Sequence, residues 1–125
     1  MASQGRGARI KGANFERKLA TILSEKTKLE AKRGLAQTRG GGAEVSDVEI
    51  KYIHIEAKNH KRCNIKAALR QAINDCSANG KIPVAVTKDD REPILCTMLL
   101  EDWIEFFNSY IEFIEKEPME ILDST

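Results

Sequence analysis

Hydrophobic and polar residues alternate along this chain with two different periods. A period of three to four residues places apolar side chains on one side of a helix, whereas a period of two places them on one face of a strand. The helical period occurs in residues 14–26, 64–79 and 101–115. The strand period, or a short β-branched run, occurs in residues 47–58, 82–87 and 94–98. We expect helices and strands at these positions, and a further short strand near residues 35–37.

Residue types at the ends of the helical stretches support this assignment. Asn14 and Asn64 stand where the first and second helices would be capped, because a side-chain oxygen can accept from the first turn. Gly80 stands where the second helix would stop, and Pro118 lies just past the end of the third. A tight turn near Lys51–Tyr52 would divide residues 47–58 into two strands, the second ending at Lys58.

The resulting order is helix, strands, helix, strand, strand, helix. This order predicts an α/β fold, in which a central mixed β-sheet is flanked by helices. The length of 125 residues suits one compact domain. We therefore expect a single domain over residues 1–125, with a flexible basic arm at residues 1–12 and a frayed tail at residues 119–125.

The composition is that of a folded protein in water. Hydrophobic residues make up 42% and charged residues 31% of the chain. No apolar run approaches the roughly 20 residues that span a bilayer, and the polar N-terminus does not resemble a secretory signal. Cys63, Cys76 and Cys96 form neither a CxxC pair nor an even set, so we expect reduced, structural thiols. A cytoplasmic protein, of a prokaryotic cell or a virus-infected host cell, is expected.

Charge is unevenly distributed although the net charge is only +1. Residues 1–40 hold 10 Lys/Arg against 3 Asp/Glu, whereas residues 99–125 hold 1 against 8. A basic front and an acidic tail suggest one face that binds a polyanion and another that avoids it.

The strand that ends at Lys58 carries the residues with the most chemistry. His54, Glu56 and Lys58 share one face because side chains alternate along a strand. Asp47, at the start of the neighbouring strand, can bring a second carboxylate beside Glu56. Two carboxylates and the backbone carbonyl of Ala57 offer the oxygen ligands that Mg²⁺ or Mn²⁺ prefers. Such a metal polarises a phosphate and activates a water, and the Lys58 ammonium can stabilise the developing charge.

These residues belong to an ordered set of motifs. The set reads Lys11-Gly12-Ala13-Asn14-Phe15-Glu16-Arg17, then Arg39-Gly40-Gly41-Gly42, then Asp47, then Glu56-Ala57-Lys58. It resembles the PD-(D/E)XK nuclease superfamily and, within it, the Holliday junction resolvases of archaea and phages. Ser46 stands where the superfamily usually has a proline. The resemblance spans roughly residues 9–107 and implies a restriction-endonuclease-like αβββαβ core.

The resemblance also implies roles for individual residues. Glu16 would be the acid of the first helix, Asp47 and Glu56 the principal metal ligands, and Lys58 the catalytic lysine. Thr38 and Gln71 are accessory candidates, Thr38 as a hydroxyl in the glycine-rich loop and Gln71 as a glutamine directed at the site. His54 is either a general base or a neighbour of the site.

Two surfaces are expected beside the active site. Basic residues on the active-site side are candidates for DNA phosphate contacts; they are Arg9, Lys11, Arg17, Arg39, His60, Lys61 and Arg62. The last helix carries an aromatic stripe too broad for one thin contact, namely Trp103, Phe106, Phe107, Tyr110 and Phe113. We expect part of this stripe to form a homodimer interface.

The function that these patterns indicate is a metal-dependent, structure-selective DNA endonuclease that resolves four-way junctions and binds no membrane. One alternative is another PD-(D/E)XK endonuclease of the phage repair or replication type. A second is a catalytically silent DNA-binding module of the same fold, which would have no need for the intact set of Asp47, Glu56 and Lys58. An RNA-binding protein is disfavoured because no aromatic stacking surface is predicted on the sheet.

Overall fold

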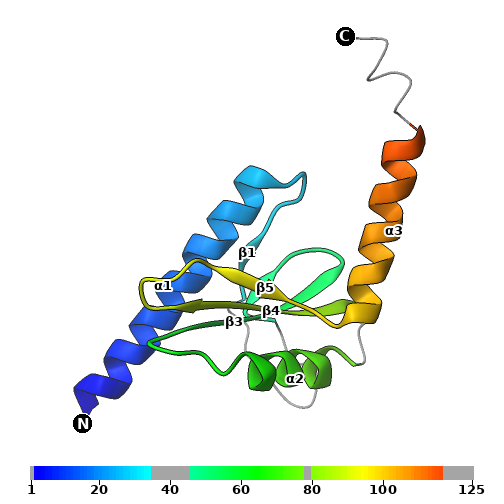
Figure 1. Cartoon of the computed structure of the whole chain (residues 1–125). Coiled ribbons are helices and arrows are strands. Elements are labelled where there is room, and N and C mark those ends of the chain that lie inside the picture. The colour runs from blue at the N-terminus through cyan, green and yellow to red at the C-terminus, as the bar shows by residue number, and fades with distance from the viewer. Residues whose placement is uncertain (1, 35–45, 78–79, 117–125) are drawn as a thin grey trace.

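A computed structural model describes residues 2–34, 46–77 and 80–116 of the chain. The described elements follow one another as α1 (Ala2–Lys26), β1 (Lys32–Arg33), β2 (Val48–Glu49), β3 (Ile53–His60), α2 (Ile65–Cys76), β4 (Ile82–Asp89), β5 (Leu95–Thr97) and α3 (Leu100–Lys116). Figure 1 shows a central sheet with α1 and α2 packed beside it and α3 leaving its far end. The α/β class and the αβββαβ order are thereby confirmed.

The five strands form one mixed sheet in the order β1-β2-β3-β4-β5. Strands β3 and β4 are parallel, and the other neighbouring pairs are antiparallel. Parallel neighbours need a crossover connection, which α2 supplies. Between β2 and β3 the chain reverses through the predicted tight turn, where Tyr52 takes a φ of 77°.

The two faces of the sheet are covered by different helices. Phe15 and Leu19 of α1 pack in one core with Ile55 and Val84 of the central strands. Side chains alternate along a strand, so the residues between these, such as His54, turn to the opposite face. There α2 directs its buried stripe, which consists of Ala68, Ala72 and Cys76. The central strands are therefore buried on both faces.

Helix α1 is longer than the expected helix over residues 14–26. It begins at Ala2, so the expected flexible arm at residues 1–12 is helical from its second residue. Extension of a formed helix avoids the nucleation step, which explains how the glycine-containing turns continue it. Lys11 also holds this segment to the body through an ion pair with Asp90, with Nζ 2.6 Å from Oδ1. Asn14 is not a cap; its side chain accepts a hydrogen bond from Arg17.

Other boundaries differ by a few residues. Asn64 caps α2 as predicted, with its side chain accepting from the backbone N–H of Ala67 at 3.0 Å. Strand β3 continues past Lys58 to His60, because its pairing with β4 runs on to that residue. The predicted strand near residues 35–37 and the predicted tail lie outside the described residues. All three cysteines are free thiols, as expected.

Helix α3 contributes nothing to the core. None of its 17 residues is buried, and it extends away from the sheet in Figure 1. Trp103 and Phe107 stack on one another with ring centroids 5.0 Å apart. Among the helices of the described residues, none has the length and apolar character that crossing a membrane would require.

Candidate active site

The pairing of β2 with β3 brings the predicted acidic residues together. Val48 pairs with Ile55, which sets the preceding Asp47 across from Glu56. The backbone N–H of Asp47 donates to the carbonyl of Ile55 at 3.0 Å, and its carboxylate Oδ2 accepts from the N–H of Ala57 at 2.8 Å. Ser46, in the place of the usual proline, is buried and donates to the carbonyl of Val48. The carboxylate of Asp47 is thus fixed against the strand that carries Glu56 and Lys58.

Glu56 is a buried acid with one basic partner on its own strand. Its side chain is 4% exposed, and Nζ of Lys58 lies 3.2 Å from its Oε2. Burial, followed by the negative charge of Asp47, raises the pKa of Glu56 to about 7, although Lys58 acts in the opposite direction. In the metal-free protein a proton therefore competes for this carboxylate near neutral pH.

Helix α1 supplies the third acidic residue. Oε1 of Glu16 accepts a hydrogen bond from Nε of Arg33 at 2.8 Å, which ties α1 to β1. Glu16 and Arg33 line a cleft of about 330 Å³ together with Asp47 and Lys58. The remaining lining residues are Ala8, Arg9, Gly12, Ala13, Ala57, Asn59 and His60. Residues far apart in the sequence thus meet at one end of the sheet, as predicted for Glu16, Asp47, Ala57 and Lys58.

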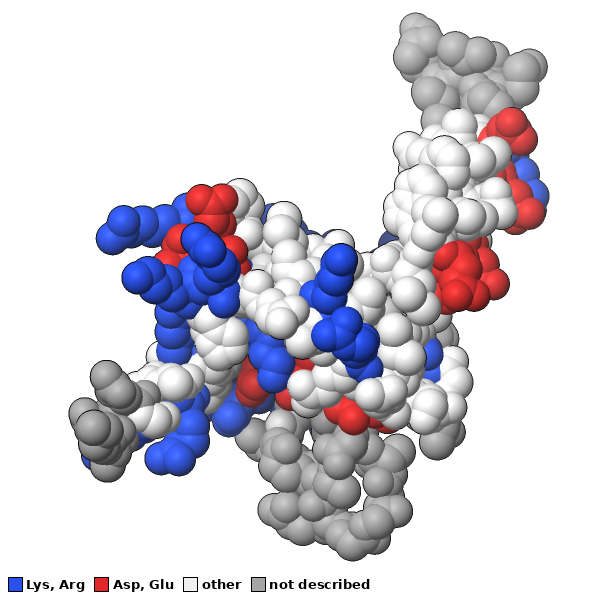
Figure 2. Space-filling view, turned by 60° about the horizontal axis from the view of Figure 1, so that its bottom comes forward, with Lys and Arg blue, Asp and Glu red and all other residues white. Residues whose placement is uncertain are grey.

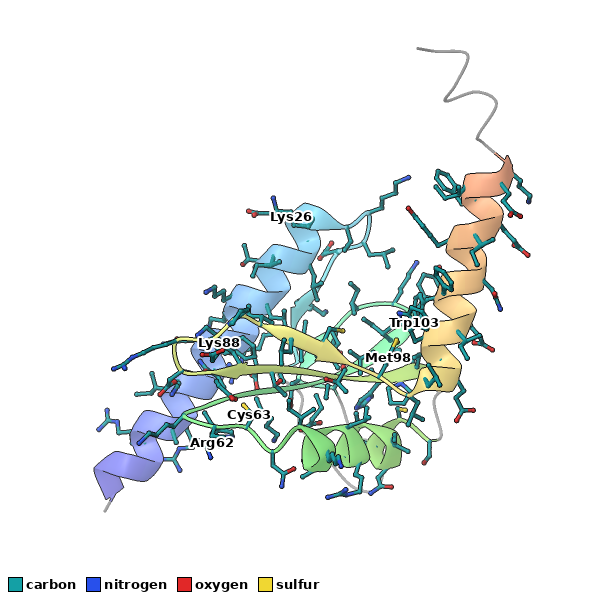
Figure 3. The ribbon with its side chains drawn as sticks, viewed as in Figure 1. Lys26, Arg62, Cys63, Lys88, Met98 and Trp103 are labelled. Atoms are coloured by element: carbon teal, nitrogen blue, oxygen red, sulfur yellow. The ribbon has the colours of Figure 1, made fainter. Side chains whose placement is uncertain are left out.

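Basic residues surround this end of the molecule. Arg9 and His60 line the cleft, and Lys61 and Arg62 line a neighbouring hollow with Arg91. Figure 2 shows blue side chains gathered over the end formed by α1, whereas red marks one edge of α3. Figure 3 shows Arg62 and Lys88 at the same end of the sheet, joined through Cys63, whose thiol contacts the carbonyl of Lys88. The surface beside the cleft therefore suits a polyanion.

Some predicted residues are not brought to the cleft. Gln71 is exposed on α2 and is not among the residues that line it. Lys11 is engaged by Asp90, and Arg17 is exposed with its guanidinium on Asn14. Thr38 and Arg39 lie outside the described residues.

Sequence reasoning missed several residues near the site. Arg33 was not singled out, because no local pattern shows that a cation on β1 would meet Glu16 on α1. Lys88, near the end of β4, and Arg91, in the turn that follows this strand, extend the basic surface. His54 was considered, but its neighbour was not: one ligand atom each of His54, Glu56 and Asp75 lies within 4.8 Å of the others.

The donor set at the cleft fits a divalent metal. Asp47 and Glu56 are close enough for the charge of one to raise the pKa of the other, and a cation between them would relieve that repulsion. Carboxylate and carbonyl oxygens are the ligands that Mg²⁺ and Mn²⁺ prefer. Asp47, Glu56 and the carbonyl of Ala57 would hold such an ion, while Lys58 adds a positive charge beside it.

Comparison with known proteins agrees with this geometry. No curated protein and no solved structure matches the chain. The sequence profile of one family, described as "phage putative PDDEXK endonuclease", matches residues 7–121. That range includes most of the first helix, the paired strands that carry the acids, and the lysine beside Glu56. The name of the family indicates nuclease activity, with nucleic acid as the substrate. The chain belongs to the phage PDDEXK endonuclease family.

Proposed function

We propose that the chain is a Mg²⁺- or Mn²⁺-dependent endonuclease that cleaves branched DNA, with the four-way junction as its preferred substrate. The observation that carries the catalytic part is the meeting of Asp47, Glu56 and Lys58. The Asp47 carboxylate is 2.8 Å from the N–H of Ala57, and the Lys58 ammonium is 3.2 Å from Glu56. Asp47 and Lys58 line a cleft that basic residues border, whereas Glu56 is buried next to Lys58 and is not among the lining residues.

The residues of the site divide the work. Asp47, Glu56 and the carbonyl of Ala57 would hold the metal, which when bound would supply Lewis-acid chemistry at the scissile phosphate. Lys58, a third exposed, orients that water or stabilises the charge that develops on the phosphate. Glu16, which Arg33 holds through an ion pair, would help to hold the metal or a water from the side of α1.

The basic end of the molecule supplies most of the affinity for DNA. Arg9 and His60 flank the acids in the cleft, and Lys61 and Arg62 continue the surface. Phosphate contacts of this kind position a duplex without reading its sequence. Recognition then depends on the shape of the DNA, which favours selection of a branch over selection of a base sequence.

Resolution of a four-way junction requires two symmetric nicks, and one chain has one site. A homodimer is therefore part of the proposal, with α3 as its interface. The apolar residues of α3 recur every three to four positions and remain exposed; they include Trp103 at 47%, Phe106 at 47%, Phe107 at 44% and Tyr110 at 59%. The acidic residues lie on the other side of the helix, at one edge in Figure 2.

A second copy of α3 is the best occupant of this face. An aromatic side chain buries about 150–250 Å² when fully covered. At roughly half exposure, the five aromatic residues of one α3 offer on the order of 500 Å². The exposed side chains of Leu100, Ile104 and Ile114 add to this area and bring it closer to the roughly 800 Å² per partner of a stable interface. Residues 117–125 are a poorer occupant, because this segment is acidic like α3 itself. Its large apolar residues are Met119, Ile121 and Leu122. An antiparallel pair of helices related by a two-fold axis would cover both faces and leave both acidic edges in water.

Cleavage assays on labelled DNA test this proposal. A four-way junction, a linear duplex, a single strand and a flap are compared at equal concentration, with Mg²⁺ and with chelator. We expect the junction to be cut fastest, with paired nicks and only when metal is present. Asp47→Ala and Glu56→Ala should abolish cleavage yet bind the junction nearly as well as the original chain, because basic residues dominate binding.

Each alternative function predicts a different result in the same assay. Equal cleavage of linear duplex and junction would favour a general PD-(D/E)XK endonuclease. Binding without cleavage at any metal concentration would favour a silent DNA-binding module. Cleavage by Asp47→Ala at the original rate would contradict the proposed metal site.

A further inference from the structure

A second group of metal-ligating side chains lies between β3 and α2. His54 and Glu56 reach it from the strand, and Asp75 reaches it from the helix, with one ligand atom of each within 4.8 Å of the others. His54 is 1% exposed and Glu56 is 3% exposed, while Asp75 is half-buried. The group therefore differs from a cluster of surface acids, because a buried imidazole and a buried carboxylate face a third ligand from another element.

The charge around Glu56 is unbalanced. Asp47 and Asp75 both act on Glu56 as negative neighbours, and Lys58 is the positive group that acts on it. Charges of one sign are unfavourable together in a medium of low dielectric constant. A metal held by Asp47 and Glu56 would offset the negative charge of Asp47. The negative charge of Asp75, on α2, would still act on Glu56.

We propose that His54, Glu56 and Asp75 bind a second divalent cation, of the class of Mn²⁺, Co²⁺ and Zn²⁺. The imidazole nitrogen favours these ions over Mg²⁺, which prefers oxygen ligands alone. Ligand atoms around such an ion lie roughly 3–4 Å apart, so small side-chain rotations close the site. The half-buried Asp75 provides the side from which an ion enters.

The two metal sites share Glu56 and differ in every other ligand. The inference rests on the proposed function only through that shared carboxylate. Cleavage would therefore not separate the two sites, whereas the number of bound ions would. Asp47 belongs only to the cleft site, and Asp75 belongs only to the site between β3 and α2.

Equilibrium dialysis of the metal-free protein against Co²⁺ counts the bound ions. We expect the original chain to bind two ions, Asp47→Asn to bind one, and Asp75→Asn to bind one. His54→Gln should lose the same ion as Asp75→Asn; because His54 is buried, Asp75→Asn decides if His54→Gln does not fold. With Mg²⁺ in place of Co²⁺, we expect the original chain to bind one ion at the same concentrations.

Asp102→Asn is the matched control. Asp102 lies near the end of α2, where its charge acts on Cys76, but it does not belong to the ligand group. This variant should bind two Co²⁺ ions. The proposal is overturned if Asp75→Asn also binds two, or if the original chain binds only one. The cleavage assay of Asp47→Ala does not depend on the second ion. It therefore tests the nuclease proposal independently of the ion count.

Discussion

Strand β3 and helix α3 depart from the usual distribution of residues in opposite directions. On β3, His54 and Glu56 are buried although they are polar. On α3, Trp103 and Phe107 are about half exposed although they are among the most apolar side chains of the protein. Buried polar groups need partners, and exposed apolar surface needs cover. The two departures therefore suit two different kinds of partner, a cation beside the acids of the strand and a protein surface on the helix.

The largest effect is expected from Lys58→Ala. This variant tests whether β3 contributes to the rate of cleavage apart from its contribution to metal binding. Lys58 lies beside Glu56 but offers no oxygen ligand. Its loss should slow cleavage by about two to three orders of magnitude, while binding of Mn²⁺ is retained. Single-turnover cleavage and dialysis against Mn²⁺ measure the two properties.

Lys66→Ala is the control for this variant, because Lys66 is exposed on α2 outside the cleft. It should cleave at the original rate. If Lys58→Ala loses metal binding or does not fold, Lys58 has a structural role and the proposed division of work is wrong.

The next effect concerns α3. Phe107→Asp or Tyr110→Asp should place a charge in the proposed dimer interface and weaken dimerisation by about 2 kcal/mol or more, roughly thirtyfold in the dissociation constant. Asn108→Asp adds the same charge on the polar side and should leave the dimer unchanged. Sedimentation equilibrium at micromolar concentration measures both. A chain that is monomeric under all conditions would remove the argument for paired nicking.

A third prediction follows from the raised pKa of Glu56. An acid whose pKa is higher in the folded protein favours folding most below its ordinary value of 4.5, and this contribution is lost as the pH rises through about 7. In the metal-free protein, Glu56→Gln should therefore increase the free energy of unfolding by roughly 3 kcal/mol at pH 8. Near pH 4 the two proteins should be equally stable.

Urea unfolding in chelator at both pH values measures this difference. Glu25→Gln, at an exposed position of α1, is the control and should show no such dependence on pH. If Glu56→Gln changes the free energy of unfolding equally at pH 4 and pH 8, then packing, rather than the charge of Glu56, determines the effect of the substitution. Added Mn²⁺ should stabilise only the chain with Glu56 at pH 8.

The comparison also shows which features local sequence patterns can predict. The period of the apolar residues located α2 and α3, and alternation placed His54, Glu56 and Lys58 on one face of β3. The hairpin at Tyr52 then required Asp47 to lie near Glu56, as the structure shows. These features depend on neighbours along the chain, so the sequence carries them directly.

Features that depend on distant packing were not predicted. Arg33 meets Glu16, and Asp75 approaches His54, only because α1 and α2 cover opposite faces of the sheet. The start of α1 was placed too late because its glycines lower helix propensity, whereas the contact of Lys11 with Asp90 forms only in the folded chain. The breadth of the aromatic stripe indicated that part of α3 faces away from the core, but the exposure of all its residues depends on the sheet being covered without it.

The smallest effect distinguishes a helix that covers the sheet from one that does not. Asn64 caps α2, whose buried stripe packs over His54 and Glu56, so Asn64→Ala should lower the free energy of unfolding by about 1 kcal/mol. Asn74→Ala, at an exposed interior position of the same helix, should change it by a few tenths at most or increase it slightly, because alanine favours the helix. Asn108→Ala on α3 should likewise leave unfolding nearly unchanged, since no residue of that helix is buried. Denaturant unfolding of the three variants at one protein concentration measures the differences. Equal losses for Asn64→Ala and Asn108→Ala would mean that α3 belongs to the folded core as much as α2 does, and the contrast between the two regions would not hold.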